Sequence, residues 1–316
     1  MLRYTLSRLV QAILVMGVMS FLLFMLIGFM PGDPIETMFE GNPAMTPDLV
    51  NQMRALYGLD QPVTSRYWHW LVAALHGDFG YSSLYFRPVL DVLWPAVLQT
   101  IKLISATLLV SIPLALALGI VAARRPNGWV DSLVGAFSFA AISMPSFWMS
   151  LLLVSVFSVR LHALPATGVP LQNDASLLTQ IRYMILPVTV MSLFYVGPLI
   201  RYVRASMLET LSADYIRTAR AKGLSEAAVL IRHALPNALV PLITVLALSF
   251  GHLFSGALVV ETIFGMLGMG KMIYSGVTNV DFNLALVGLL FVTFLVLASN
   301  LLADLAYAYL DPRIVL

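Results

Sequence analysis

Residues 214–236 read DYIRTARAKGLSEAAVLIRHALP and form one long polar segment near the middle of an otherwise apolar chain. Its charged residues are Asp214, Arg217, Arg220, Lys222, Glu226 and Arg232, with alanines between them and Gly223 at the centre. Alanine, leucine and arginine favour helix, whereas glycine interrupts a helix and often ends one. The pattern predicts two short helices hinged at Gly223. Because apolar runs flank the segment, it is expected to be a polar element held between two membrane spans and suited to docking.

The composition predicts a polytopic helical membrane protein, an all-α fold. The 316 residues are 59% hydrophobic and only 11% charged, and the mean hydropathy is +0.88. Ordinary soluble domains carry about 25% charged residues, and a soluble fold of this size has too little core to bury so much apolar side chain. The chain has no cysteine, which excludes disulfide bonds and thiolate metal sites.

Six stretches are long and apolar enough to cross a bilayer, since a span needs roughly 20 such residues. They lie near 9–30, 98–122, 132–158, 185–205, 238–260 and 284–309. The first follows two arginines, as in a secretory signal peptide, but it exceeds the roughly 7–15 apolar residues of a signal. We therefore expect a retained span. Ser143-Met144-Pro145 predicts a kink in the third span. No second domain is evident, so residues 1–316 are read as one transmembrane domain.

Lysine and arginine are more frequent in the loops on one side, which predicts that both termini are cytoplasmic. The loop 206–237 is then cytoplasmic and the loop 31–97 external. The external loop is acidic in balance, with Asp33, Glu36 and Glu40 near its start. Within it, Thr46-Pro47-Asp48 predicts the start of a helix through Tyr57, and residues 77–80 predict a turn. A loop of this length either contacts an external partner or caps the bundle.

Signals of catalysis are missing from the sequence. No histidine pair has the spacing of a helical zinc site, and no G-x-x-x-x-G-K-[ST] nucleotide loop occurs. We therefore expect no enzyme activity, cofactor or metal in this chain, and the net charge of +2 gives no indication of nucleic acid. Few charges lie at the expected midplane, where an ion-driven carrier usually needs them, so the driving energy is expected to enter elsewhere.

Polar side chains within the expected spans are candidates for lining a translocation path. They are Ser143, Tyr195, Ser249 and His252. Small and hydroxyl-bearing residues in membrane bundles more often serve helix packing and interhelical hydrogen bonds, so both roles stay open for each.

The segment 214–236 resembles the cytoplasmic EAA-type loop of ABC importer permeases. The other matching stretches are Gly32-Asp33-Pro34, Gly58-Leu59-Asp60-Gln61-Pro62, Gly77-Asp78-Phe79-Gly80, residues 214–224 and Asp311-Pro312-Arg313-Ile314. Together they are similar to the dipeptide/oligopeptide/nickel branch, and within it to the first of its two permease subunits, over essentially the whole chain. Two positions depart from the pattern: residues 266–270 read MLGMG where Trp-Pro-Gly-Leu-Gly is common, and Pro236 stands where arginine is frequent.

The resemblance implies a type I permease fold of six spans in the bacterial inner (plasma) membrane. It implies a heterodimer with a second permease, two ATP-binding subunits that hold ATP and magnesium, and an external solute-binding protein. The residues that would form the coupling helix to an ATPase are Asp214, Tyr215, Arg217, Thr218, Ala219, Arg220, Lys222 and Gly223. The implied cargo is a short peptide or a related small solute, with a nickel chelate or glutathione as alternatives.

Three other hypotheses stay open at this stage. The chain could be a self-sufficient ion-coupled secondary transporter or channel, or a membrane scaffold without a pathway. The segment 214–236 could also be an amphipathic linker that lies on the lipid headgroups, where its arginines would be favourable.

Overall fold

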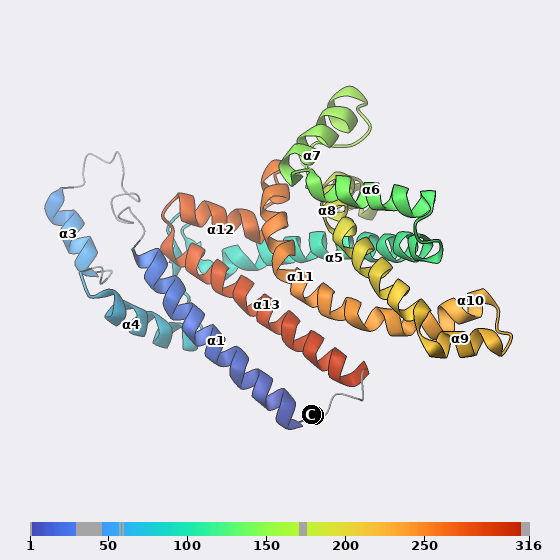
Figure 1. Cartoon of the computed structure of the whole chain (residues 1–316). Coiled ribbons are helices and arrows are strands. Elements are labelled where there is room, and N and C mark those ends of the chain that lie inside the picture. The colour runs from blue at the N-terminus through green and yellow to red at the C-terminus, as the bar shows by residue number, and fades with distance from the viewer. Residues whose placement is uncertain (1, 30–45, 57, 59, 171–175, 311–316) are drawn as a thin grey trace. The chain divides into compact units, whose positions relative to one another are not determined.

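The computed structural model describes residues 2–29, 46–56, 58, 60–170 and 176–310. The regular secondary structure of this part of the chain is helical apart from one two-stranded hairpin, which confirms the all-α fold class (Figure 1). It divides into two compact units. The first consists mainly of Ile101–Met266 and Ser299–Leu316, and the second of Leu2–Thr100 and Leu267–Ala298. The motifs at residues 32–34 and 311–314 lie outside the described residues.

The helices and strands of the described residues follow one another along the chain. In order they are α1 (Leu2–Gly28), α3 (Pro47–Leu56), α4 (Val63–Leu75), β1 (Tyr81–Ser82), β2 (Arg87–Pro88), α5 (Val89–Arg124), α6 (Trp129–Ser143), α7 (Ser146–Leu153), the π-helix η1 (Val154–Arg160), α8 (Leu177–Ser212), α9 (Asp214–Ala221), α10 (Glu226–Ala228), the π-helix η2 (Val229–Ala234), α11 (Leu235–Ile263), α12 (Met269–Thr278) and α13 (Phe282–Leu310).

Every expected span falls on a helix or helix pair: α1, α5, α6 with α7 and η1, α8, α11 and α13. Among the described residues, four helices are long and apolar enough to cross a membrane, or five if the bent pair α6–α7 is one span. Helix α11 covers the expected fifth span, but many of its side chains lie outside the described set. The six-span count therefore stays a prediction.

The third expected span, 132–158, is broken. Helix α6 and the helical stretch Ser146–Arg160 meet at 98°. Met144 is extended (φ −87°, ψ 122°), as is Pro145. A residue that precedes proline is disfavoured in the helical region because it clashes with the proline ring. The expected kink is thus a full break, and its last part, residues 154–160, is a π-helix.

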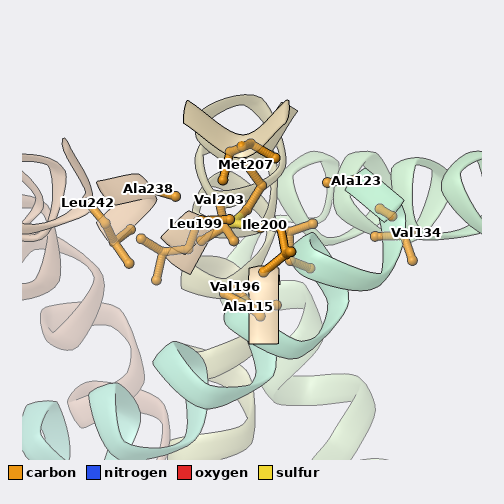
Figure 2. Close-up of a cluster of buried hydrophobic side chains, with 14 of the residues drawn as sticks. Ala115, Ala123, Val134, Val196, Leu199, Ile200, Val203, Met207, Ala238 and Leu242 are labelled. Carbon is orange, nitrogen blue, oxygen red and sulfur yellow. The ribbon is translucent and has the colours of Figure 1, made fainter. Parts of the chain in front are cut away.

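The core of the first unit is built around α8. Figure 2 shows Val196, Leu199, Ile200, Val203 and Met207 from α8 among buried side chains of the neighbouring helices. Those neighbours are Ala115 and Ala123 of α5, Val134 of α6, and Ala238 and Leu242 of α11. Small residues let the backbones approach closely. A Cβ added at Gly197 would stand 2.8 Å from the Ser138 carbonyl oxygen of α6.

In the second unit the described part of the loop 31–97 folds onto membrane helices. Tyr67 of α4 hydrogen-bonds to Ser20 of α1 through the two hydroxyls (2.9 Å), and its ring meets that of Phe24 edge-on. The buried Asp281 carboxylate, just before α13, accepts hydrogen bonds from the Ser82 hydroxyl and the Leu84 amide of the hairpin. This packing supports the capping role. Contact with an external partner stays a prediction.

Local predictions for this loop are confirmed where the structure describes them. Helix α3 begins at Pro47 and ends at Leu56, within one residue of the expected helix. Gly77 and Gly80 adopt positive φ angles of 88° and 80°, as expected for a turn at residues 77–80. The acidic residues Asp33, Glu36 and Glu40 lie outside the described residues.

Candidate functional site

The polar segment forms a helix, a glycine turn and a second helical stretch, as its sequence predicts. Helix α9 ends where the Gly223 amide donates to the Arg220 carbonyl (2.9 Å) and the Leu224 amide to the Ala219 carbonyl (3.4 Å). These bonds form a Schellman cap, which needs a left-handed residue after the helix. Gly223 supplies it with φ +76°. The Ser225 hydroxyl then accepts from the Ala228 amide (3.3 Å) and begins α10, which continues into η2.

One face of α9 is seated in the core of the first unit. Ile216 is fully buried and Ala219 is 5% exposed, and both belong to the cluster that includes Met207 of α8. Val229 and Ala234 of η2 complete the seat from the other side of the glycine turn. Ala219 was expected among the residues of the coupling site. Because Ala219 is buried, its side chain packs α9 against the core and is not accessible to a partner.

The opposite face of α9 is exposed and charged. The other predicted coupling residues, Asp214, Tyr215, Arg217, Thr218, Arg220, Lys222 and Gly223, are all exposed. Arg217 Nη1 lies 3.3 Å from Asp214 Oδ1, and both side chains are largely open to solvent. Arg220 donates from Nε and Nη2 to both carboxylate oxygens of Glu226 (2.9 and 3.2 Å). Exposed pairs of this kind contribute only about 0–1 kcal/mol, so a partner can replace them at little cost.

The helices next to α9 are fastened together by polar contacts. Arg204 of α8 donates from Nε and Nη2 to the two oxygens of Asp131 in α6 (2.5 and 2.6 Å). The same carboxylate accepts the Asn127 amide (2.9 Å), which fixes the turn between α5 and α6. Ser206 of α8 donates to the Ala238 carbonyl of α11 (2.9 Å). These contacts link α8 directly to α6 and to α11.

The Asp131–Arg204 pair was not predicted from the sequence. The two residues are 73 positions apart, and no motif or helical spacing links them. The only signal for this ion pair in the sequence is weak: an aspartate lies in the first turn of one span and an arginine lies near the end of another.

The candidate path residues are only partly described. Ser143 is exposed at the end of α6, beside the break. Tyr195 is buried in α8 at 5% exposure. One turn earlier, the hydroxyl of Ser192 is buried without a hydrogen-bond partner in the described part of the chain. The side chains of Ser249 and His252 lie outside the described set. A path through these four positions therefore stays a prediction.

The chain matches two known protein families. Residues 115–316, which contain α9 and its seat, match the family described as the binding-protein-dependent transport system inner membrane component. Residues 1–118 match the corresponding N-terminal family. The chain belongs to this family of permeases.

Relatives match the permease from end to end. It is 38% identical over 310 residues, 98% of both chains, to a putative peptide transport system permease protein of Brucella abortus (strain 2308). It is 36% identical over 311 residues to a probable peptide ABC transporter permease protein of Sinorhizobium fredii, with 98% of each chain covered. It is 33% identical over 314 residues, 99% of both chains, to a glutathione transport system permease protein of Escherichia coli.

These matches establish the general function. The chain is a multi-pass inner-membrane permease subunit of an ABC importer, and not an enzyme. A binding-protein-dependent system implies an ATPase partner and a solute-binding protein. This excludes the self-sufficient carrier and the scaffold as leading hypotheses, because both would function without those partners.

Proposed function

We propose that this permease forms half of the translocation path for short peptides. Its partners are a second permease in a heterodimer, two ATP-binding subunits that hold ATP and magnesium, and an external binding protein. Both termini and the loop 206–237 are cytoplasmic, and the loop 31–97 is external. The permease itself holds no cofactor and hydrolyses no ATP. The proposed path positions are Ser143, Tyr195, Ser249 and His252. The full-length match to relatives named for peptide transport supports the cargo.

The observation that carries the proposal is the two-faced character of α9. Its exposed charged face docks on an ATPase, and its buried face, Ile216 and Ala219, is fixed in the membrane bundle. A short rigid helix held in this way transmits a rigid-body movement, because packed interfaces shift between discrete arrangements and do not deform continuously. Closure of the ATPases on ATP thus changes the access of the path from one side of the membrane to the other.

Reversal of charge on the docking face tests this function. We expect the double variant Arg217→Glu with Arg220→Glu to reduce ATPase association and peptide uptake in proteoliposomes by tenfold or more. The loss of important interface residues typically costs about 2 kcal/mol of binding free energy, which corresponds to at least this factor. Membrane insertion should be unchanged, because both side chains are outside the core. Arg125→Glu, an exposed arginine in the turn between α5 and α6, is the matched control and should transport normally. Normal uptake by the double variant would contradict the docking assignment.

A second cargo is favoured by one specific relative. The glutathione permease of Escherichia coli covers the whole chain, and glutathione is itself a small peptide. Uptake of a labelled dipeptide into proteoliposomes with the complete transporter should be measured against unlabelled tripeptide, glutathione and a nickel chelate. Competition by glutathione alone would replace the general peptide cargo with that narrower one. Competition by the nickel chelate alone would overturn both.

A further inference from the structure

A polar pocket lies at the end of α8 that is far from the coupling helix. It has a volume of about 560 Å³ and lies between the end of η1, the loop that follows it and the first turns of α8. Its polar lining consists of Ser158, His162, Thr179, Arg182 and Tyr183. Helix α8 continues for about 45 Å from Arg182 to Ser212, just before α9. If α9 is cytoplasmic, as the proposed function requires, the pocket is on the external face.

Several local features indicate that this pocket is built for a ligand. Residues 154–160 form a π-helix, a rare conformation that is frequent at functional sites. His162 adopts a left-handed φ of 49°, a strained conformation for a residue with a side chain. The hydroxyl of Ser158 is buried without a hydrogen-bond partner in the described part of the chain. An unsatisfied buried hydroxyl is costly, and a ligand in the pocket would satisfy it.

The charge of the pocket selects the ligand. Among the residues that the structure describes, the lining includes arginine and histidine and no acidic side chain. Arg182 donates from Nη2 to the Ala163 carbonyl (3.0 Å), which holds the guanidinium in place at the rim. A guanidinium carries five N–H donors in a planar fork that matches a carboxylate. With hydroxyls from Ser158 and Tyr183 nearby, the pocket fits a carboxylate.

The pocket is also connected to the end of α11. The loop that lines it, residues 162–166, continues to Gly168, whose amide donates to the Phe264 carbonyl (2.7 Å). Phe264 and Met266 are fully buried, and a Cβ at Gly168 would stand 2.5 Å from Met266. A ligand in the pocket therefore bears on a loop that is fixed to the core of the first unit. A lipid headgroup would need no such connection, whereas a docking protein that starts a transport cycle would use it.

We propose that this pocket receives an acidic side chain of the external binding protein when that protein docks on the permease. The proposal rests on the proposed function, because it needs both the binding protein and the external placement. Arg182 forms the ion pair, and Ser158 and Tyr183 donate further hydrogen bonds. When the pocket is occupied, the loop to Gly168 transmits the change to the end of α11.

The test measures docking of the binding protein on the complete transporter in phosphatidylcholine nanodiscs. We expect Arg182→Ala to weaken the affinity by about tenfold, since hydrogen bonds to charged groups are among the strong ones at interfaces. Arg182→Lys keeps a donor for Ala163 and should give an intermediate loss, which separates docking from misfolding. Ser158→Ala removes a single oxygen and should cost a few-fold. Arg160→Ala, an exposed neighbour that does not line the pocket, is the matched control and should leave the affinity unchanged.

Charge exchange identifies the partner group. Arg182→Glu should abolish docking, and one acidic residue of the binding protein changed to arginine should restore it. Unchanged docking with a raised KM for peptide would assign the pocket to the carboxylate of the cargo and overturn the proposal. An effect that appears only when phosphatidylglycerol is added would assign it to lipid and overturn it as well. Failure of the proposed function is recognised separately, because the wild-type transporter would then neither bind the binding protein nor retain ATPases.

Discussion

Gly223 shows how a single residue decides the geometry of the polar segment 214–236. Its φ of +76° is in the left-handed region, which other residues adopt only with strain. A Cβ at this position would meet no atom within 4 Å. The backbone conformation, and not the available space, therefore requires glycine. Without it the Schellman cap that ends α9 and turns the chain toward η2 is strained.

Gly223→Ala is expected to destabilise this turn by about 1 kcal/mol, the cost of a left-handed conformation for alanine. The end of α9 should fray, so hydrogen exchange of the Gly223 and Leu224 amides should accelerate and less peptide should be transported per ATP hydrolysed. Gly135→Ala in α6 also meets open space but has no positive φ, and it should change neither property. Equal behaviour of the two variants would refute the conformational argument.

At the scale of elements, α8 holds the first unit together. It packs against α6 and α11, and a Cβ at Gly119 of α5 would stand 2.7 Å from its Val203. Gly197 is in contact with the backbone of α6 at Ser138. A backbone atom cannot move aside as the end of a flexible side chain can, so this crossing depends on the absence of a side chain.

Gly197→Ala is expected to separate α8 from α6 and to destabilise the permease by about 1–3 kcal/mol, as overpacking does in well-packed cores. The thermal unfolding midpoint of the purified protein should fall by several degrees. Gly17→Ala in α1, where a Cβ meets nothing within 4 Å, provides the matched comparison and should not lower it. A midpoint that is the same for both variants would show that α6 can shift to accommodate the methyl group.

The elements show what sequence could predict and what it could not. Long apolar runs locate helices, because a helix forms all of its backbone hydrogen bonds within one segment, as lipid requires. The polar segment predicts its own turn through Gly223. The sequence predicted a kink before Pro145, whereas the structure has a break of 98°. A proline indicates where a helix is interrupted, but the angle of the interruption depends on packing. The π-helices at 154–160 and 229–234 have no local signal. The Asp131–Arg204 pair needs the fold to bring its partners together.

At the scale of the whole molecule, two long helices belong to both compact units. The chain passes between the units within α5, at Thr100 and Ile101, after α11, at Met266 and Leu267, and within α13, at Ala298 and Ser299. The coupling segment, the Asp131–Arg204 pair and the polar pocket all belong to the first unit. The proposed docking of an ATPase at one end of α8 and of a binding protein at the other would therefore act on a single packed unit.

This architecture separates docking from transmission. In the proposed function the charged face of α9 binds the ATPase, whereas Ile216 is buried and fixes the helix to the bundle. Ile216→Ala leaves a cavity that costs about 2–5 kcal/mol at the seat, while the charged face stays unchanged. The ATPase subunits should still copurify and hydrolyse ATP. The amount of peptide transported per ATP should fall severalfold, because a loosely seated α9 moves without moving α8 and the helices packed against it.

The same substitution at an exposed isoleucine provides the control. Ile231 in η2 is 61% exposed, so Ile231→Ala removes the same carbon atoms without leaving a buried cavity, and coupling should be unchanged. The measured quantity is the ratio of peptide uptake to ATP hydrolysis in proteoliposomes. If Ile216→Ala instead lost its ATPases as Arg217→Glu with Arg220→Glu is expected to, seat and docking face would be one inseparable surface. If its ratio matched wild type, force would have to enter the bundle elsewhere than through α9.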